Sequence, residues 1–260
     1  MASLAHSRND AGIAEAIILI KAAPVIGKKN GETVCSAGID IYGKWLRLYP
    51  VSFRVLEDGK RFKRWDRVKF DWRLPTNDSR IESRHVNNQT LEISGNMKSR
   101  ERPAFLNKHI VTSLNKEFSE GRSLALLAPE ILEFKITKKS VDKLGQQQRD
   151  IDLFHAQSDM FIPRPAVPVT ACPFEFKYRY RTEDGEREGT CQDWETEATF
   201  FNWRNEYGEA KALTEMQIQF GERLPERGLF FAMGTHSLYP ETWLINGLIQ
   251  LKAPAQDTLF

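Results

Sequence analysis

The segment FEFKYRYR, residues 174–181, constrains the fold most, because it alternates strictly between aromatic and charged side chains. Successive side chains of a β-strand point to opposite faces, so the segment predicts a strand with one aromatic and one charged face. Similar strand-like runs occur at residues 15–22, 32–39, 44–50, 66–74, 131–138, 228–235 and 242–251. So many short strands predict a sheet-rich domain.

Helical patterns lie between these strands. One helix is expected over residues 103–120, with Pro103 in its first turn and Gly121 just past its end. Two more are expected over residues 192–207 and 212–224, whereas the run GQQQRD at 145–150 predicts a loop. The pattern indicates a β-rich α+β fold of two tandem small, partly open β-barrels of the oligonucleotide-binding (OB) type with inserted helices. PUA-like barrels or a single mixed sheet fit nearly as well.

The division into domains follows from the segment IPRPAVPVTACP, which carries four prolines and predicts an extended linker. We therefore expect a flexible tail at 1–12, a first barrel domain with a helical insert at 13–161, the linker at 162–173, a second α+β barrel domain at 174–253 and a tail at 254–260.

The three cysteines, odd in number and without a C-x-x-C pair, predict neither a disulfide framework nor a structural zinc site, and indicate a reducing cytoplasm. The longest apolar run is interrupted by Lys21 and Pro24 and is shorter than the roughly 20 residues of a membrane helix, so no membrane partner is expected. Phosphate-binding loops, dinucleotide fingerprints, nucleophile elbows and paired histidines are absent, so we expect no metal site and no cofactor.

The net charge of +2 conceals an uneven distribution. Residues 41–110 hold 16 Lys or Arg against 8 Asp or Glu, whereas residues 183–209 hold 2 against 9. The first excess can mark a surface for a polyanion, although both regions can also be ordinary solvated surface.

The hairpin WLRLYP suggests where such a polyanion would bind. If Leu46 and Leu48 face the core, Trp45, Arg47 and Tyr49 line the opposite face, a combination on which bases stack while arginine holds phosphate. Alternatively, this face packs beneath the protein's own helix. Interleaved basic and aromatic residues downstream favour nucleic acid. The predicted binding residues are Trp45, Arg47, Tyr49, Arg54, Trp65, Lys69, Arg80, Arg84, Lys177, Tyr178, Arg179 and Tyr180.

Two polar clusters also allow an enzyme. Residues 76–86 place Glu82 and His85 beside arginines as a possible acid–base pair, although a structural ion-pair row is the more ordinary interpretation. Asp193 and Glu195 could act with Mg²⁺ or Mn²⁺, but acids in a first helical turn are also explained by the helix dipole.

Four segments together resemble the dual-OB-containing domain family, a group of microbial proteins of which some are linked to defence systems. The resemblance runs from about residue 16 to 251 and rests on ETVCSAGIDIYGKWLRLYPVSFR, DSRIES, DWE and GTHSLYPETWLINGL. It implies two tandem barrels and nucleic-acid binding by analogy of fold.

The sequence thus favours a non-catalytic protein that binds single-stranded DNA or RNA. One alternative is a metal-dependent or acid–base enzyme acting on nucleic acid or nucleotides. Another is a nucleotide-ligand sensor or scaffold in a defence complex, in which residues 183–209 contact a basic protein partner.

Overall fold

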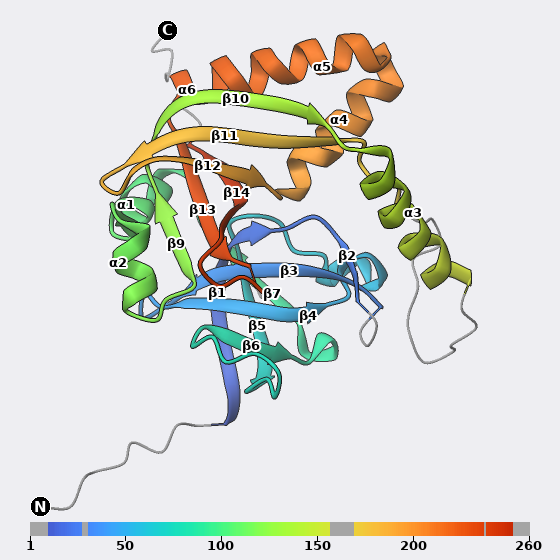
Figure 1. The fold of residues 1–260 in the computed structure, drawn as a ribbon. Coiled ribbons are helices and arrows are strands. Elements are labelled where there is room, and N and C mark those ends of the chain that lie inside the picture. Colours follow the sequence, from blue (N-terminus) through green and yellow to red (C-terminus); the bar gives the residue numbers. More distant parts are fainter. Residues whose placement is uncertain (1–9, 28–30, 157–168, 237, 252–260) are drawn as a thin grey trace, which may run out of the picture.

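The computed structural model describes residues 10–27, 31–156, 169–236 and 238–251. Their strands form two seven-stranded sheets, which lie one above the other in Figure 1. The first sheet contains β1 (Ala11–Lys21), β2 (Val25–Gly27), β3 (Gly31–Asp40), β4 (Trp45–Val51), β5 (Asp66–Arg73), β6 (Ser83–Val86) and β7 (Glu92–Asn96). The second contains β8 (Ile110–Val111), β9 (Leu124–Leu127), β10 (Glu130–Lys138), β11 (Phe174–Thr182), β12 (Gly185–Cys191), β13 (Leu229–Thr235) and β14 (Trp243–Gln250).

Five strands of the first sheet close into a barrel. They follow the order β1-β3-β4-β6-β5, and β5 pairs with β1 to complete the circle. β1 is long enough to pair with β5 through residues 11–17 and with β3 through residues 16–21. β4 and β6 run parallel, and the other barrel pairs are antiparallel. This is the strand order of an OB barrel, so the predicted fold class is confirmed.

The second sheet repeats this order. Its strands run β10-β11-β12-β14-β13-β9-β8, and β12 and β14 are the parallel pair equivalent to β4 and β6. Only Ala128 and Pro129 separate β9 from β10, although β10 forms one edge of the sheet and β9 lies next to the opposite edge. Proline has no N–H to donate to a strand ladder, which explains why the two strands part there.

The helices lie mainly around the second sheet (Figure 1). α4 and α5 connect β12 to β13. α5 lies over the second sheet on the side away from the first barrel, whereas α4 begins at Trp194, which packs against the first core. The helices are α1 (Arg102–Asn107), α2 (Leu114–Ser119), α3 (Val141–Ala156), α4 (Trp194–Tyr207), α5 (Glu209–Ile218) and α6 (Leu224–Glu226), with a π-helical turn at Gln219–Arg223 and 3₁₀ turns at Phe53–Val55, Asp58–Lys60, Asn88–Thr90 and Ser99–Glu101.

Two helix predictions are wrong. The helix expected over 103–120 is divided, because β8 pairs with β9 and Ser113 caps a new helix by accepting a hydrogen bond from the Lys116 N–H. The run expected to be a loop at 145–150 lies inside α3, which Ile151 and Phe154 anchor by burying their side chains three residues apart.

The predicted domain boundary also changes. β8, β9 and β10 pair within the second sheet, so residues 110–138 do not belong to the first barrel domain expected over 13–161. The sequence missed this because long-range strand pairing leaves no local signal in β9 and β10. Residues 162–168 and the predicted tails, apart from residues 10–12, lie outside the described residues, and 169–173 contain no helix or strand.

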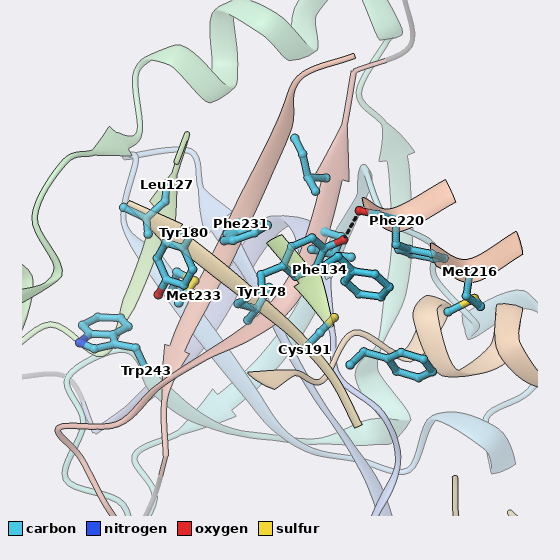
Figure 2. Packing of buried hydrophobic residues seen from close by; sticks show 14 of the residues in the cluster. Leu127, Phe134, Tyr178, Tyr180, Cys191, Met216, Phe220, Phe231, Met233 and Trp243 are labelled. Atoms are coloured by element: carbon cyan, nitrogen blue, oxygen red, sulfur yellow. Dashed lines mark hydrogen bonds between the residues drawn. The ribbon is translucent and has the colours of Figure 1, made fainter. Parts of the chain in front are cut away.

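The alternation in FEFKYRYR is confirmed, because its aromatic face forms the centre of the second core (Figure 2). Tyr178 and Tyr180 are 0% and 1% exposed. Tyr178 donates its hydroxyl hydrogen to the Phe220 carbonyl at 3.0 Å, so the buried phenol is satisfied. Both rings also pack against Phe231.

The pairing of β1 and β3, in which Gly38 lies opposite Ile18, gives a test of the first barrel. A Cβ atom at Gly38 would lie 2.2 Å from the backbone oxygen of Ile17, which no side-chain rotation relieves. We expect Gly38→Ala to lower the free energy of unfolding by about 1–3 kcal/mol or more, measured in urea. Gly59→Ala is the matched control, because no atom lies within 4 Å of its added Cβ. Equal stability of the two variants would contradict this packing.

Candidate functional site

Part of the outer face of the first barrel is covered by the second sheet. Ile17 and Leu19 of β1 and Ile39 of β3 belong to one buried cluster with β9, β13 and β14 residues, among them Leu126 and Ile249. OB barrels offer oligonucleotides the face of their second and third strands, which are β3 and β4 here. The hairpin face predicted to bind nucleic acid therefore adjoins the contact between the barrels.

The predicted alternation of the hairpin is confirmed, but the role of Arg47 is wrong. Leu46 and Leu48 fill the first barrel, while Trp45 packs half-buried against the inter-barrel cluster. Arg47 is only 3% exposed and donates from Nη2 to the carbonyl and hydroxyl oxygens of Ser123, at 3.0 and 3.2 Å. It serves the second barrel instead of a phosphate. Of the three, Tyr49 is exposed.

Glu82 joins the same buried network. Its carboxylate accepts hydrogen bonds from the Ser123 N–H at 2.7 Å and the Ser123 hydroxyl at 2.8 Å. Glu82 is buried, and its carboxylate holds the second sheet in place through Ser123 instead of facing an open cleft, as the predicted acid–base role would require. Arg80 reaches the same barrel, donating to the Thr235 carbonyl at 3.1 Å.

The ion-pair row expected at residues 80–84 does not form. Arg80 is held by the Asp78 carboxylate, with a 2.6 Å bond from its Nη2, and Arg84 stacks over Trp72 at 4.5 Å from the ring centre. β6 begins only at Ser83, so these residues lack the strand alternation that the row requires.

Asp193 is a structural cap. It is 1% exposed and accepts from the Glu195 N–H at 2.8 Å, the Leu248 N–H at 2.6 Å and Arg64 Nη2 at 2.8 Å. The predicted catalytic role of Asp193 is therefore wrong, because each contact holds α4 or the first barrel in place and solvent does not reach it. Glu195 stays largely exposed, 3.6 Å from Arg64.

His85 lies on β6 of the first barrel, away from α4 where Glu195 lies. Its Nε2 is 3.3 Å from Arg73 Nη2, and burial together with this arginine lowers the pKa of His85. Among the described residues, no three His, Cys, Asp or Glu side chains are grouped so that they could hold a metal ion.

Three predicted aromatic residues are buried, so their predicted role as base-stacking surfaces is wrong. Tyr178 and Tyr180 lie in the second core. Trp65 is 6% exposed, and Arg102 covers its ring at 4.8 Å. Alternation alone shows which residues share a face, but it does not show which face is covered.

The cations on the outer face of the second sheet are neutralised by carboxylates. Lys177 lies near Glu188, and Arg179 contacts Glu133 and Glu186 at 3.3 and 3.1 Å. We call this array the charge ladder: Lys135, Lys177, Arg179 and Arg181 with Glu130, Glu133, Glu175, Glu186 and Glu188. The ladder also uses part of the acidic excess seen at 183–209.

Six cations of the first half lack such partners among the described residues, and two of them, Arg67 and Lys108, line one cleft. We call these six residues the basic face: Lys44, Arg67, Lys69, Lys98, Arg100 and Lys108. Within the described part of the chain, none of them has a carboxylate oxygen within 4.0 Å. The excess of Lys and Arg over residues 41–110 indicated this region, but of these six residues only Lys69 was among the predicted binding residues.

A cleft of about 500 Å³ opens in the basic face, between β1, the β3–β4 hairpin and α1. Arg67 and Lys108 line it together with Tyr42, Phe105 and His109. Tyr42 is 80% exposed, while the Phe105 and His109 rings meet edge to face at 5.0 Å. The cleft thus combines cations with aromatic surfaces.

The two acids in this cleft are occupied by other partners. Glu15 accepts from the Ser94 hydroxyl at 2.6 Å, and Asp40 accepts from the backbone N–H groups of Tyr42 and Lys44 at 2.9 and 2.8 Å. Asp40 therefore shapes the hairpin turn and leaves the neighbouring cations unpaired.

A larger cleft of about 700 Å³ lies between the strand β2, α3 and α4. Arg54, a predicted binding residue, reaches it but is bound to Glu32 at 3.0 Å. Cys172 and Cys191 also line it, and burial raises the pKa of these thiols to about 11 and about 12. Both are therefore protonated at neutral pH and are weak nucleophiles.

Two family models match the chain. A domain of unknown function, DUF8758, matches residues 13–110, and a second, DUF8757, matches residues 108–260. The chain belongs to the DUF8757 family. The boundary between the DUF8758 and DUF8757 matches falls where the chain leaves the first sheet for the second.

No curated protein matches this DUF8757 chain. The chain has weak structural similarity to a solved structure of a replication protein A heterotrimer bound to single-stranded DNA. The TM-score is 0.27 and the sequence identity 9%, and the match covers 95% of this chain and 67% of that chain. A TM-score this low does not indicate a shared function. No helix among the described residues is long and apolar enough to span a membrane.

The Asp78–Arg80 contact predicts a pH dependence. Burial raises the pKa of Asp78, but hydrogen bonds from Arg80 and Ser83 outweigh it and hold the pKa below its usual value. A carboxyl whose pKa is lower folded than unfolded stabilises the fold above its unfolded pKa, and this contribution disappears as the pH falls through the folded pKa. We expect the stability advantage of the wild type over Asp78→Asn to be constant above about pH 5 and to shrink below about pH 4.

The measurement is urea unfolding of both proteins from pH 2.5 to 8. The control is the same comparison in an Arg80→Ala background, where the pH dependence of the difference should become smaller. An unchanged pH dependence there would show that Arg80 does not stabilise the carboxylate.

Proposed function

We propose that this protein binds single-stranded nucleic acid through the basic face, with Tyr42, Phe105 and His109 contacting bases. The main support is the contrast in charge pairing between two sets of cations, those of the charge ladder and those of the basic face. On the charge ladder, each Lys and Arg has a carboxylate nearby, whereas the basic face has none within 4.0 Å among the described residues.

Pairing matters because a phosphate must compete with whatever already neutralises a cation. Unpaired Lys and Arg hold only mobile counterions, and releasing these on phosphate contact favours binding. A cation held by carboxylates on both sides gains less from a phosphate. The basic face is therefore the better polyanion site, although both surfaces contain several cations.

The aromatic groups in the smaller cleft favour a single strand over a duplex. Bases of a single strand are free to stack on aromatic side chains, which is how sequence-tolerant binders gain much of their affinity. Tyr42 projects from the hairpin between β3 and β4 and is 80% exposed, so its ring is available to a base.

Several earlier predictions stay proposals. Tyr49 and Lys69 are exposed and could extend the path, whereas Arg84 is half-buried and stacks over Trp72. Both halves have the strand order of OB barrels, which supports membership of the dual-OB-containing domain family. A part in microbial defence follows only from that resemblance. A cytoplasmic location follows from the cysteine usage, and a basic protein partner for residues 183–209 follows from their negative charge.

The test is a titration of fluorescently labelled (dT)₁₅ and (rU)₁₅ followed by anisotropy at 50 and 200 mM NaCl. We expect binding that weakens with salt, with a slope that falls by roughly 0.7 for each phosphate contact removed. Arg67→Ala and Lys108→Ala should each weaken binding several-fold and reduce the slope. Lys177→Ala and Arg179→Ala on the charge ladder are the matched controls and should change little.

Two results would overturn the proposal. One is no binding of either oligonucleotide at 50 mM NaCl. The other is a loss of affinity in the ladder variants as large as that in the basic-face variants, which would place the contact elsewhere.

A separate variant tests stacking. Tyr42→Ala should cost about 1–3 kcal/mol of binding free energy, because one base loses its aromatic partner. Tyr239, which is 65% exposed on the second half, provides the control substitution Tyr239→Ala. Since charge is unchanged, the salt slope should stay the same in both variants, and a changed slope in Tyr42→Ala would argue against stacking.

A further inference from the structure

The larger cleft lies apart from the basic face and has its own chemistry. Its walls come from the connection between β1 and β3, from α3, from β11 and from α4. Its volume of about 700 Å³ is in the range of small-molecule sites, which are commonly 300–1,000 Å³. Phe174, Phe201 and Ile151 contribute apolar surface.

Two of the four cations in this cleft are already paired. Arg54 binds the buried Glu32, and Lys143 binds Glu175. The other two, Lys139 and Arg204, have no carboxylate within 4.0 Å among the described residues.

These two free cations are nevertheless held in position. Lys139 donates to the Gln147 side-chain oxygen at 3.0 Å, and the Arg204 guanidinium stacks over Phe201 at 4.9 Å. They form a prearranged pair of positive charges along one cleft.

Glu197 has the opposite character in the same cleft. No described residue forms a hydrogen bond or an ion pair within 4.0 Å with its carboxylate. Burial raises the pKa of Glu197, and the charge of Lys139 opposes this only in part. Glu197 is half-buried, and a partly desolvated acceptor gains from any donor that a ligand supplies.

We propose that this cleft binds a nucleotide, with its phosphate between Lys139 and Arg204, its base or ribose donating a hydrogen bond to Glu197, and its base against the apolar wall. A simple anion would satisfy the cations but be repelled by Glu197. A simple cation would meet the reverse problem. A nucleotide carries negative charge, N–H and O–H donors and a flat ring in one molecule, and it fits the volume.

The experiment is isothermal titration of the full chain with ATP, GTP, AMP and GMP, and separately with adenosine, guanosine and inorganic phosphate. We expect at least one nucleotide to bind, with the matching nucleoside and phosphate each at least tenfold weaker. Glu197→Gln, Lys139→Ala and Arg204→Ala should each weaken that nucleotide about tenfold. Lys138→Ala and Glu209→Gln, both exposed neighbours in sequence, should leave it unchanged.

Failure of this site can be told apart from failure of the basic face. Glu197→Gln and Lys139→Ala should keep full affinity for (dT)₁₅, and Lys108→Ala should keep full affinity for the nucleotide. Thermal melting of each variant shows whether it folds. Lys139 follows the end of β10, Glu197 lies in the first turn of α4 and Arg204 in its last turn, so one unfolded variant does not decide the result.

Three outcomes would overturn the assignment. The first is that no nucleotide binds at 1 mM. The second is that inorganic phosphate binds as tightly as the nucleotide, which would leave a phosphate site only. The third is that the site variants and the control variants lose affinity equally.

Discussion

The contact between the first barrel and the second sheet determines what the rest of the surface can do. β1 presents one set of apolar side chains to the first barrel and another, including Ile17 and Leu19, to the second half. Each buried Ile or Leu contributes about 1.5–3 kcal/mol relative to exposure, so covering this face is strongly favoured. Arg47 and Glu82, both bonded to Ser123, add directional contacts that fix how the halves meet. The face on which an OB barrel would offer a ligand surface is thereby used for assembly.

Much of the fold could be predicted from the sequence, because alternation is a local property. The strand FEFKYRYR and the hairpin WLRLYP both place their side chains on the expected faces. Strand partners are non-local, and for this reason β10 was assigned to the wrong half although it was recognised as a strand. The helix α3 was missed because its apolar anchors, Ile151 and Phe154, are sparse in a polar segment.

The binding site was harder to predict than the fold. A face rich in aromatics and arginine has the same pattern whether it contacts a ligand or another part of the chain, and Arg47 contacts the chain. Likewise Asp193 and Glu82 have the residue type of a catalytic acid. However, the carboxylate of each accepts a hydrogen bond from a backbone N–H group, and that of Glu82 also accepts one from a hydroxyl. The local charge excess was the more useful signal, since it placed the basic face in the correct region without naming most of its residues.

Charge pairing separates residues that build this protein from those available to a ligand. A cation that contacts a carboxylate, as Arg179 does, has its field largely cancelled within a few ångströms. Arg67 and Lys108 have no carboxylate oxygen within 4.0 Å among the described residues, and the two acids of their cleft, Glu15 and Asp40, are hydrogen-bonded to a hydroxyl and to the hairpin backbone. The same distinction marks the larger cleft, where both signs of charge lie unpaired along one apolar wall. A surface with one free sign suits a polyanion, and a cavity with both suits a small molecule that carries acceptors and donors together.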